Sequence, residues 1–282
     1  MPEGHTLHRL AGALTDAFGG RRVAVSSPQG RFAADAALLD GSVLTAADAA
    51  GKHLFVDLQH DRLIHVHLGL IGKFDVVTGA DEVPVPVGQV RLRLVTIDGA
   101  QTSYADLRGA IICDLVGPTR RDEIVAALGP DPLRPDADPA RAWGRITKSS
   151  RPIGDLLMDQ HVLAGVGNVY RAEVLFRHKI HPLRPGRTLR RGQFEALWSD
   201  LVALMGEGVR TGRIDTVRPE HTPAAMGRPP RTDRGGGEVY VYRRTGLPCL
   251  VCGARVRTGV LVGRNLFWCS QCQRRFRSRA LQ

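Results

Sequence analysis

Two pairs of cysteines near the C-terminus constrain this chain more than any other feature. Cys249 and Cys252 form one C-x2-C pair, and Cys269 and Cys272 form a second pair after 16 intervening residues. Each C-x2-C unit folds into a tight turn that points two sulfur atoms at one ion, so the two turns predict a tetrahedral Zn²⁺ site with four thiolate ligands. Such a site leaves no coordination position open, which makes the one zinc structural. A redox pair or chance spacing is the alternative, but redox motifs do not come as two matched pairs at this separation.

The segment that holds these cysteines is basic. From Cys249 to Gln282 the chain has seven arginines and no acidic residue. Zinc supplies folding energy that so short a segment cannot obtain from an apolar core, and we expect it to hold a hairpin that contacts DNA phosphates. A solvated basic tail is the alternative interpretation of the charge. The fifth cysteine, Cys113, stands apart and is expected to be a buried core thiol.

The whole chain shares this positive charge. Its 282 residues have a net charge of +11, which indicates a polyanionic partner such as nucleic acid. This length allows two or three domains with cores of their own. The sequence has no run of 18 or more apolar residues and no signal-peptide pattern. We therefore expect a cytoplasmic, nucleoid-associated protein without a membrane partner.

Hydrophobic periodicity divides the chain into parts. A helix is expected over residues 2–18, where apolar residues recur at helical spacing, and β-rich runs separated by turns extend from about 22 to 116. A Pro- and Asp-rich connector follows at 129–142. Further helices are expected over 153–164, 169–178 and 190–210, and a Pro-, Gly- and Arg-rich mobile loop over 217–237.

A glycine turn, A-G-V-G-N, separates the first two of these later helices. Gly165 and Gly167 permit a sharp turn and a close approach of the backbone to a ligand, and Asn168 is expected to cap the second helix. The free amides of a helix N-terminus attract anions, so the turn is a candidate site for DNA phosphates. An ordinary helix–helix turn would have the same pattern.

The amino terminus offers a possible nucleophile. Removal of Met1 is expected because a small second residue, proline included, allows it, and Pro2 then carries a free secondary amine. The reference pKa of an α-amino group is about 7.7–8.0, so a neutral fraction can attack an electrophilic carbon. Glu3 could donate or shuttle protons beside it. Taken alone, a Met-Pro start followed by a first-turn acid is commonplace.

Taken together and in order, these segments resemble the formamidopyrimidine-DNA glycosylase/endonuclease VIII family over nearly the whole chain. The resemblance rests on MPEGHT at the start, GKHLF at 51–55, HLGLIG at 67–72, LLMDQHVLAGVGNVYRAEVLFRHKIHP at 156–182 and PC-x2-C…GRNLFWC-x2-CQ at 248–273. The opening MPEG is more similar to the endonuclease VIII branch, and among its members to the actinobacterial second endonuclease VIII-like group.

The resemblance implies a multidomain α+β fold. Its parts would be an N-terminal β-sandwich fronted by a helix, a helix–two-turns–helix domain and a C-terminal β-hairpin zinc finger. The corresponding boundaries are 2–125 for the catalytic sandwich domain, 126–144 for a hinge, 145–237 for the helical domain with its mobile loop, and 238–282 for the zinc finger.

The resemblance also implies an activity. The protein would be a bifunctional DNA glycosylase/AP lyase of base excision repair that removes oxidised bases, pyrimidines in preference, and cuts the strand by β,δ-elimination. Pro2 would be the nucleophile that forms a Schiff base with the sugar, and Glu3 the general acid. Lys52 would donate a proton in β-elimination, Arg264 would bind the phosphates that flank the lesion, and Asn168 would bind phosphate.

Several positions depart from the family patterns. Gly69 stands where the endonuclease VIII branch has a polar residue, and Leu70 and Ile71 stand where the purine-directed branch has a Met–Ser pair. Leu70 is therefore a candidate wedge that fills the void left by a flipped base, and Arg108 is a candidate for insertion opposite the lesion.

Two other functions stay open. One is the same chemistry on oxidised purines such as 8-oxoguanine or formamidopyrimidine. The other is a zinc-finger protein that binds damaged DNA without catalysis, which would have no need of Pro2 and Glu3 at the terminus. The expected partner in each case is double-stranded or bubble DNA with oxidised bases or abasic sites, bound by a monomer.

Overall fold

The chain forms two compact units, Met1–Ala127 and Leu128–Gln282, each with a hydrophobic core of its own. The computed structural model describes residues 2–99, 101–232 and 237–276. Met1 and parts of the two predicted segments 217–237 and 238–282 (residues 233–236 and 277–282) lie outside the described residues. Among the described helices, none combines the length and the apolar character that a membrane span requires.

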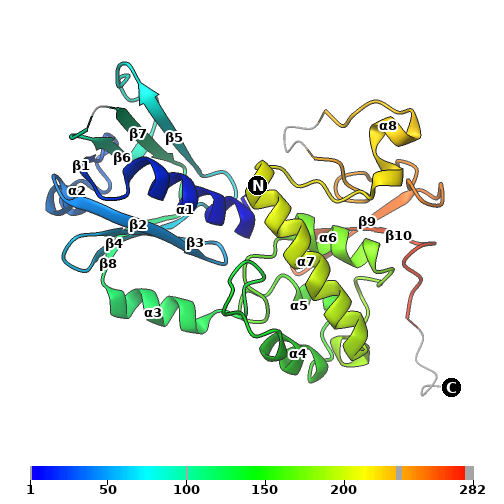
Figure 1. Cartoon of the computed structure of the whole chain (residues 1–282). Helices are drawn as coiled ribbons and strands as arrows, with labels where there is room; N and C mark the ends of the chain where they lie inside the picture. The colour runs from blue at the N-terminus through cyan, green and yellow to red at the C-terminus, as the bar shows by residue number, and fades with distance from the viewer. Residues whose placement is uncertain (1, 100, 233–236, 277–282) are drawn as a thin grey trace. The chain divides into compact units, whose positions relative to one another are not determined.

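The first unit is built on one continuous sheet of eight strands in the order β5-β7-β6-β1-β2-β3-β4-β8 (Figure 1). The strands are β1 (Arg21–Ser26), β2 (Val43–Ala50), β3 (His53–Leu58), β4 (Arg62–His67), β5 (Lys73–Ala80), β6 (Val90–Thr96), β7 (Thr102–Arg108) and β8 (Ile112–Val116). β1 pairs with β2 only at Arg21 and Arg22, and from Val23 to Ser26 it pairs with β6. The sheet therefore divides at β1 into two halves, which enclose the core of the predicted sandwich.

Helix α1 (Gly4–Phe18) fronts this sandwich, as the sequence predicts. Its side chains Leu7, Leu14 and Phe18 are buried, and the helix packs against β2 and β3 of one half and β5 of the other. Two further helices complete the unit, α2 (Ala33–Leu39) and α3 (Pro118–Ala127). The sequence did not predict α3, because none of its residues is buried and it therefore lacks a clear apolar stripe.

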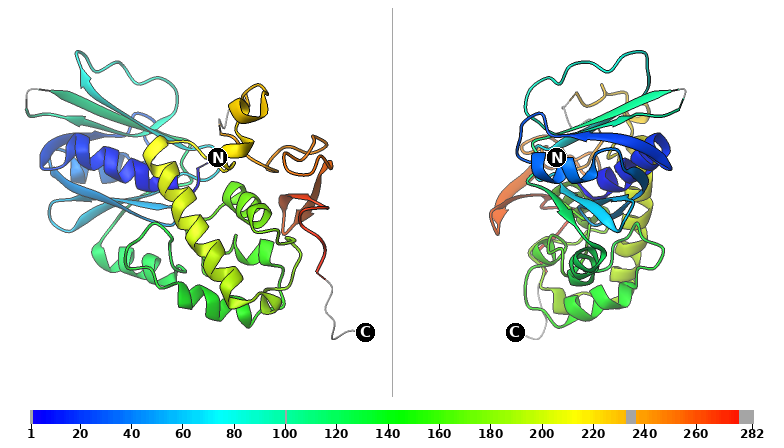
Figure 2. Two further views of the ribbon diagram at one scale, coloured as in Figure 1. Left: turned by 45° about the vertical axis from the view of Figure 1, so that its right-hand side comes forward. Right: turned by 90° about the vertical axis from the view of Figure 1, so that its left-hand side faces the viewer.

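The second unit contains the remaining helices and the hairpin near the four cysteines (Figure 2). Its elements are α4 (Pro139–Thr147), α5 (Ile153–Leu156), α6 (Asn168–Arg177), the 3₁₀ turn η1 (Gly186–Thr188), α7 (Arg191–Thr211), the 3₁₀ turn η2 (Pro219–His221), α8 (Pro223–Met226) and the strands β9 (Val256–Leu261) and β10 (Arg264–Cys269). β9 and β10 form an antiparallel hairpin. Helix α4 begins inside the segment that the sequence assigned to a connector, with Asp138 as its N-cap.

The helix predicted over 153–164 is wrong beyond its first turn. α5 ends at Leu156, and the chain then runs through turns to the glycine segment. Side chains hold these turns in place of a helix: Asp159 Oδ1 accepts from the backbone N–H of His161, and Gln160 Nε2 donates to the carbonyls of Met158 and Val166. Local side-chain bonds of this kind compete with helical hydrogen bonds.

Candidate active site

Glu3 and Pro2 lie at the start of α1. Glu3 is the N-cap of the helix, and its side chain is fully buried. Its backbone N–H donates to Thr6 Oγ1 at 3.4 Å, and its carbonyl accepts from the N–H of Thr6 at 2.9 Å. Pro2, one residue earlier, is half-buried. The helix therefore fixes an acid directly beside the amine that removal of Met1 would free.

Lys52 lies in the turn between β2 and β3. The turn has two residues, Gly51 and Lys52, since Ala50 already pairs with His53. Gly51 has φ +59°, the left-handed value that the first position of a II′ hairpin turn needs. The tight turn restricts the backbone from which the half-buried lysine side chain extends.

Helix α1 and strand β2 run antiparallel and bring these residues to the same end of the unit (Figure 1). Gly20, after the helix, donates to the Leu44 carbonyl near the start of β2, and Thr15 Oγ1 bonds Ala47 in its middle. From Thr15 back to Glu3 the helix rises ~18 Å. From Ala47 forward to Ala50, its last residue, β2 advances ~10 Å, and the turn that carries Lys52 follows directly. Pro2, Glu3 and Lys52 therefore lie toward the same end of the first unit.

Three histidines surround this turn, and the sequence reasoning missed them. His53 Nδ1 lies 2.9 Å from His65 Nε2, and the two rings stack with their centroids 5.1 Å apart. The His67 ring meets that of His53 edge-on at 5.1 Å. Burial lowers the pKa of His53 and of His65 to about 4, and the pKa of His67 is lowered as well. The positive charge of Lys52 adds to the shift at His53 and His67.

His67 presents a hydrogen-bond donor beside the Lys52 turn. Its Nδ1 accepts a hydrogen bond from the backbone N–H of Gly69 at 3.0 Å. A neutral imidazole that accepts at Nδ1 carries its proton on Nε2. The side chain thus presents an N–H donor near Lys52, and the alternating H-x-H of strand β4 was the sequence signal for it.

Leu70 and Ile71 form an exposed apolar turn at one end of the first unit. Their side chains are 54% and 82% exposed, and Ile111 on the neighbouring chain segment is 63% exposed. The two segments touch, because the N–H of Ile111 donates to the His67 carbonyl and a Cβ placed on Gly69 would lie 2.8 Å from Ile111. Gly69 also has φ +67°. A side chain at this position would be strained and would collide with Ile111, which explains why glycine replaces the polar residue of the family pattern.

Arg108 is held by partners within the first unit. Its Nη2 donates to Asp106 at 2.8 Å, its Nη1 to Asp75 at 3.1 Å and its Nε to the Val87 carbonyl at 3.1 Å. Asp106 is buried and also receives two hydrogen bonds from Arg93. Insertion of Arg108 into DNA would require at least the contacts with Asp75 and Val87 to break.

The glycine turn ends differently from the prediction. The N-cap of α6 is Gly167, with φ −117° and ψ −163°, and Asn168 is the first helical residue. The expected cap by the Asn168 side chain is therefore wrong, because its Oδ1 instead accepts from Arg171 Nη2 in the following turn. Gly165 has φ +81°, which requires glycine, and its N–H donates to Gln160 Oε1 at 3.0 Å.

Arg264 is the first residue of β10, and its side chain is exposed. A two-residue turn, Val262 and Gly263, joins it to β9, and both turn residues have positive φ. Arg171 from α6 donates to the carbonyl of the next residue, Asn265, at 2.8 Å. The hairpin and the glycine turn are thus connected within the second unit.

The four cysteines meet at one point. Their sulfur atoms all lie within 4.8 Å of one another, with Cys249–Cys272 at 3.9 Å and Cys252–Cys269 at 3.4 Å. A tetrahedral ion with Zn–S bonds of about 2.3 Å needs sulfur atoms about 3.8 Å apart. The residues therefore fit one structural Zn²⁺, as predicted. Cys113, by contrast, is buried in the core of the first unit, and burial raises the pKa of its thiol to about 12.

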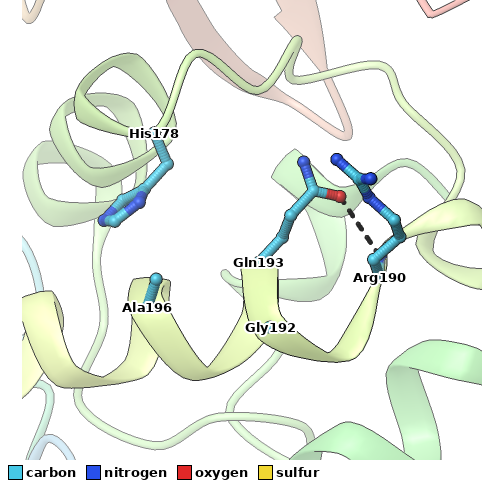
Figure 3. Close-up of a pocket in the computed structure, with 5 residues that line it drawn as sticks. All are labelled: His178, Arg190, Gly192, Gln193 and Ala196. Carbon is cyan, nitrogen blue, oxygen red and sulfur yellow. Dashed lines mark hydrogen bonds between the residues drawn. The ribbon is translucent and has the colours of Figure 1, made fainter.

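A hollow of about 440 Å³ lies elsewhere in the second unit (Figure 3). It is lined by His178 at the end of α6 and by residues at the start of α7, among them Arg190 and Gln193. Gln193 Oε1 accepts from the Arg190 N–H, and His178 Nε2 is hydrogen-bonded to Asp200. The hollow contains none of the predicted site residues.

Three family models match the chain. The formamidopyrimidine-DNA glycosylase N-terminal domain matches residues 1–111, the formamidopyrimidine-DNA glycosylase H2TH domain matches 128–219, and the zinc finger found in FPG and IleRS matches 246–275. Together they cover both units and the cysteine segment.

Curated relatives agree over nearly the full length. The chain is 54% identical to "Endonuclease 8 1" of Mycobacterium tuberculosis, over 97% of this chain and 100% of the relative. It is 32% identical to formamidopyrimidine-DNA glycosylase of Geobacillus kaustophilus (85% and 84% covered) and 31% identical to "Probable endonuclease 8 2" of Streptomyces coelicolor (97% and 94% covered). The chain is thus less similar to "Probable endonuclease 8 2" than to "Endonuclease 8 1".

Solved structures share the fold. A complex of Lactococcus lactis Fpg with DNA that contains an abasic site superimposes with a TM-score of 0.77, at 23% identity, over 97% of this chain and 100% of the other. At this identity the likeness supports the fold alone.

Proposed function

Since the chain belongs to the formamidopyrimidine-DNA glycosylase/endonuclease VIII family, whose members are DNA glycosylases with AP lyase activity, we propose that it excises oxidised pyrimidines through a Schiff base on Pro2. The observation that carries this proposal is the buried Glu3 beside Pro2, toward the end of the first unit that holds the Lys52 turn. The pyrimidine preference is supported by the 54% identity to Endonuclease 8 1, against 32% to formamidopyrimidine-DNA glycosylase.

The proposed chemistry begins with a nucleotide flipped out of the duplex. The neutral amine of Pro2 attacks C1′ of the deoxyribose, the bond from C1′ to the base breaks, and the base leaves with the bonding electrons. Glu3 protonates the ring oxygen as the sugar opens, and loss of the amine proton leaves an iminium. The position of Glu3 supports it as the proton donor, because its buried carboxyl group lies directly beside Pro2.

Strand cleavage follows from the iminium. It withdraws electrons from C2′, a proton leaves C2′, and the 3′-phosphate departs by β-elimination; the 5′-phosphate then departs by δ-elimination. Lys52 is proposed to supply the proton for the β-elimination step. Its own charge is favourable beside a phosphate, and the neutral histidines next to it add no competing charge.

Each unit is proposed to bind DNA phosphate with its own side chains. In the first unit these are Lys52 and His67, and in the second unit they are Asn168 and Arg264. The amides of the glycine turn at Gly165 and Gly167 add donors at the α6 N-terminus. Zinc, when bound to the four cysteines, supplies only the rigidity of the hairpin that carries Arg264.

We also propose that Leu70 fills the space left by the flipped base. Its exposure and that of Ile71 support this role, because a large apolar side chain in water is stabilised when it enters the base stack. Arg108 is proposed to act on the opposite strand, a role that requires it to leave Asp75.

Borohydride trapping tests the mechanism. The protein is incubated with abasic-site DNA and borohydride, after intact mass has shown that Met1 is absent. A covalent adduct is expected, and its absence from Met1-free protein would reject the lyase chemistry. Pro2→Thr should bind DNA normally but lose trapping, whereas undiminished trapping would place the nucleophile elsewhere.

Glu3→Gln separates the two activities. An abasic sugar opens without a catalyst, so this variant should still be trapped on abasic DNA but should lose base excision by at least about 100-fold, in the range of general acid catalysis. A panel of thymine glycol, dihydrouracil and 8-oxoguanine substrates then decides the branch. Preference for 8-oxoguanine would overturn the pyrimidine proposal, and binding without excision of any base would leave a damage-binding protein.

A further inference from the structure

The buried guanidinium of Arg171 joins three parts of the second unit. Arg171 lies one turn into α6, and its side chain is 1% exposed. Its Nη1 donates to the carbonyl of Gly154 in α5 at 3.2 Å, and its Nη2 donates to the carbonyl of Asn265 in β10 at 2.8 Å. Nη2 also donates to Asn168 Oδ1. One side chain thus contacts both the glycine turn and the residue that follows Arg264.

The contact with Asn168 determines which end of its amide is free. A guanidinium has hydrogen-bond donors only, so the group that faces it must be the amide oxygen and not the NH2. The NH2 of Asn168, with its two donors, therefore points away from Arg171. Asn168 is 8% exposed, so little of its side chain reaches solvent. A phosphate oxygen, which only accepts hydrogen bonds, matches that NH2.

The contact with Asn265 fixes the start of the hairpin strand. The bond joins α6 to the backbone one residue after Arg264, while the Arg264 side chain itself is exposed. Asn265 pairs with Val260 across the hairpin, so the same bond also restrains β9. The first turn of α6 and the base of the Arg264 side chain are therefore held at a fixed separation.

We propose that Arg171 is a positioning residue of the phosphate-binding surface, which orients the Asn168 amide and places Arg264 without touching DNA itself. This inference rests on the proposed role of Asn168 and Arg264 in binding phosphate. The charge of Arg171 strengthens all three hydrogen bonds, since charged donors bind about twice as strongly as neutral ones. A lysine could not replace it fully, because a single ammonium lacks the planar fork that spans three acceptors.

A double-mutant cycle tests the proposal. The variants are Arg171→Met, Asn168→Ala and the double variant, and the measurement is fluorescence anisotropy with duplex DNA that carries a tetrahydrofuran abasic analogue, over a series of salt concentrations. Asn168→Ala should weaken binding about 10-fold. Arg171→Met should weaken binding at least as much. It should also reduce the slope of log K against log salt concentration by about one unit for each phosphate that the protein no longer binds. The double variant should be no weaker than Arg171→Met alone.

Additive losses of affinity, or a salt slope that Arg171→Met leaves unchanged, would overturn the proposal. Arg177→Met is the matched control: it removes a cation from the same helix, but one that pairs with Asp200, and it should leave the salt slope unchanged. The measurement concerns binding alone, so its outcome is separate from whether Pro2 forms an adduct.

Asn168→Asp provides a second test that does not depend on Arg171→Met being folded. An aspartate keeps the bond to Arg171, and as an ion pair strengthens it, but it has no NH2. This variant should therefore keep its melting temperature and zinc content and lose DNA affinity by at least about 10-fold. Undiminished affinity in a stable Asn168→Asp protein would contradict the orientation assigned to the amide.

Discussion

The Nδ1 atom of His53 lies 2.9 Å from the Nε2 atom of His65, and the rings stack at 5.1 Å beside Lys52. One proton shared between two neutral rings satisfies this bond. The Phe55 ring also stacks on the His65 ring, with centroids 5.0 Å apart, and Asp114 on β8 lies opposite His65 on β4. The two histidines therefore have an aromatic side chain, a lysine and one acid among their neighbours.

This pair should make the first unit sensitive to acid. Burial lowers the pKa of both histidines from 6.5 to about 4, so between pH 6.5 and 4 the unfolded chain binds protons that the folded chain does not. As far as these two groups are concerned, the free energy of unfolding is highest above pH 6.5 and decreases as the pH falls toward 4. His65→Phe keeps a stacked ring and should make this loss shallower by up to about 1.4 kcal/mol per pH unit.

Urea unfolding at pH 7, 6 and 5, followed by far-UV circular dichroism, measures the effect. All three tryptophans of the chain lie in the second unit, so tryptophan fluorescence would not report on it. His60→Asn is the control, since His60 is exposed and its φ of +66° suits asparagine. An equally steep loss of stability in His65→Phe and His60→Asn would contradict the prediction.

The buried Glu173 should be essential to the second unit. Its carboxylate accepts the backbone N–H groups of residues 240, 241 and 242 and the hydroxyl of Thr216, at 2.6 to 2.9 Å. Glu173→Gln replaces one acceptor oxygen by an NH2 that faces N–H donors. We expect a loss of about 3 kcal/mol in the free energy of unfolding, measured by urea and tryptophan fluorescence.

Glu195→Gln is the matched control for this prediction. Glu195 lies on α7 and pairs with Arg191 in an exposed i,i+4 contact, so its loss should cost no more than about 0.5 kcal/mol. Equal stability of the two variants would show that the four bonds to Glu173 contribute little.

The sequence predicted those features that follow from local patterns. The cysteine spacing predicted the zinc ligands, and the helical repeat of Leu7, Leu14 and Phe18 predicted α1. The cap by Asn168 was predicted wrongly, because its side-chain oxygen accepts a hydrogen bond from Arg171 instead. The Arg171 guanidinium is held there by the Asn265 carbonyl of β10, a strand that is distant in sequence.

The histidine cluster was missed for a related reason. His53 and His65 meet only because β3 and β4 pair with Phe55 opposite His65. Period-two alternation places His53 and Phe55 on one face, and His65 and His67 on one face, but it does not specify how the two strands align. The distance between the predicted catalytic residues depends in the same way on the antiparallel run of α1 and β2.

Removal of zinc should abolish DNA binding as well as catalysis. The hairpin has little apolar core of its own and is attached by contacts such as that of Gln273 Nε2 with the Ile180 carbonyl at 2.8 Å. Cys252→Ser should lose the one zinc per chain, measured by metal analysis, and both trapping and binding with it. Cys113→Ala, which changes a thiol in the other unit, should keep its zinc and its activity. Full lyase activity in zinc-free protein would refute this role of the metal.

The exposed apolar turn should matter only for duplex DNA. If Leu70 and Ile71 fill the gap in the base stack, Leu70→Ala and Ile71→Ala should each slow excision from a duplex by about 10-fold, since a few kcal/mol are needed to unstack the base. Excision from a single-stranded oligonucleotide with the same lesion should be unchanged, because no stack has to be opened. Val85→Ala provides the control: Val85 is 81% exposed on the same unit, and its truncation should affect neither substrate. Equal losses of activity on both substrates would assign the turn to substrate binding in general and not to base flipping.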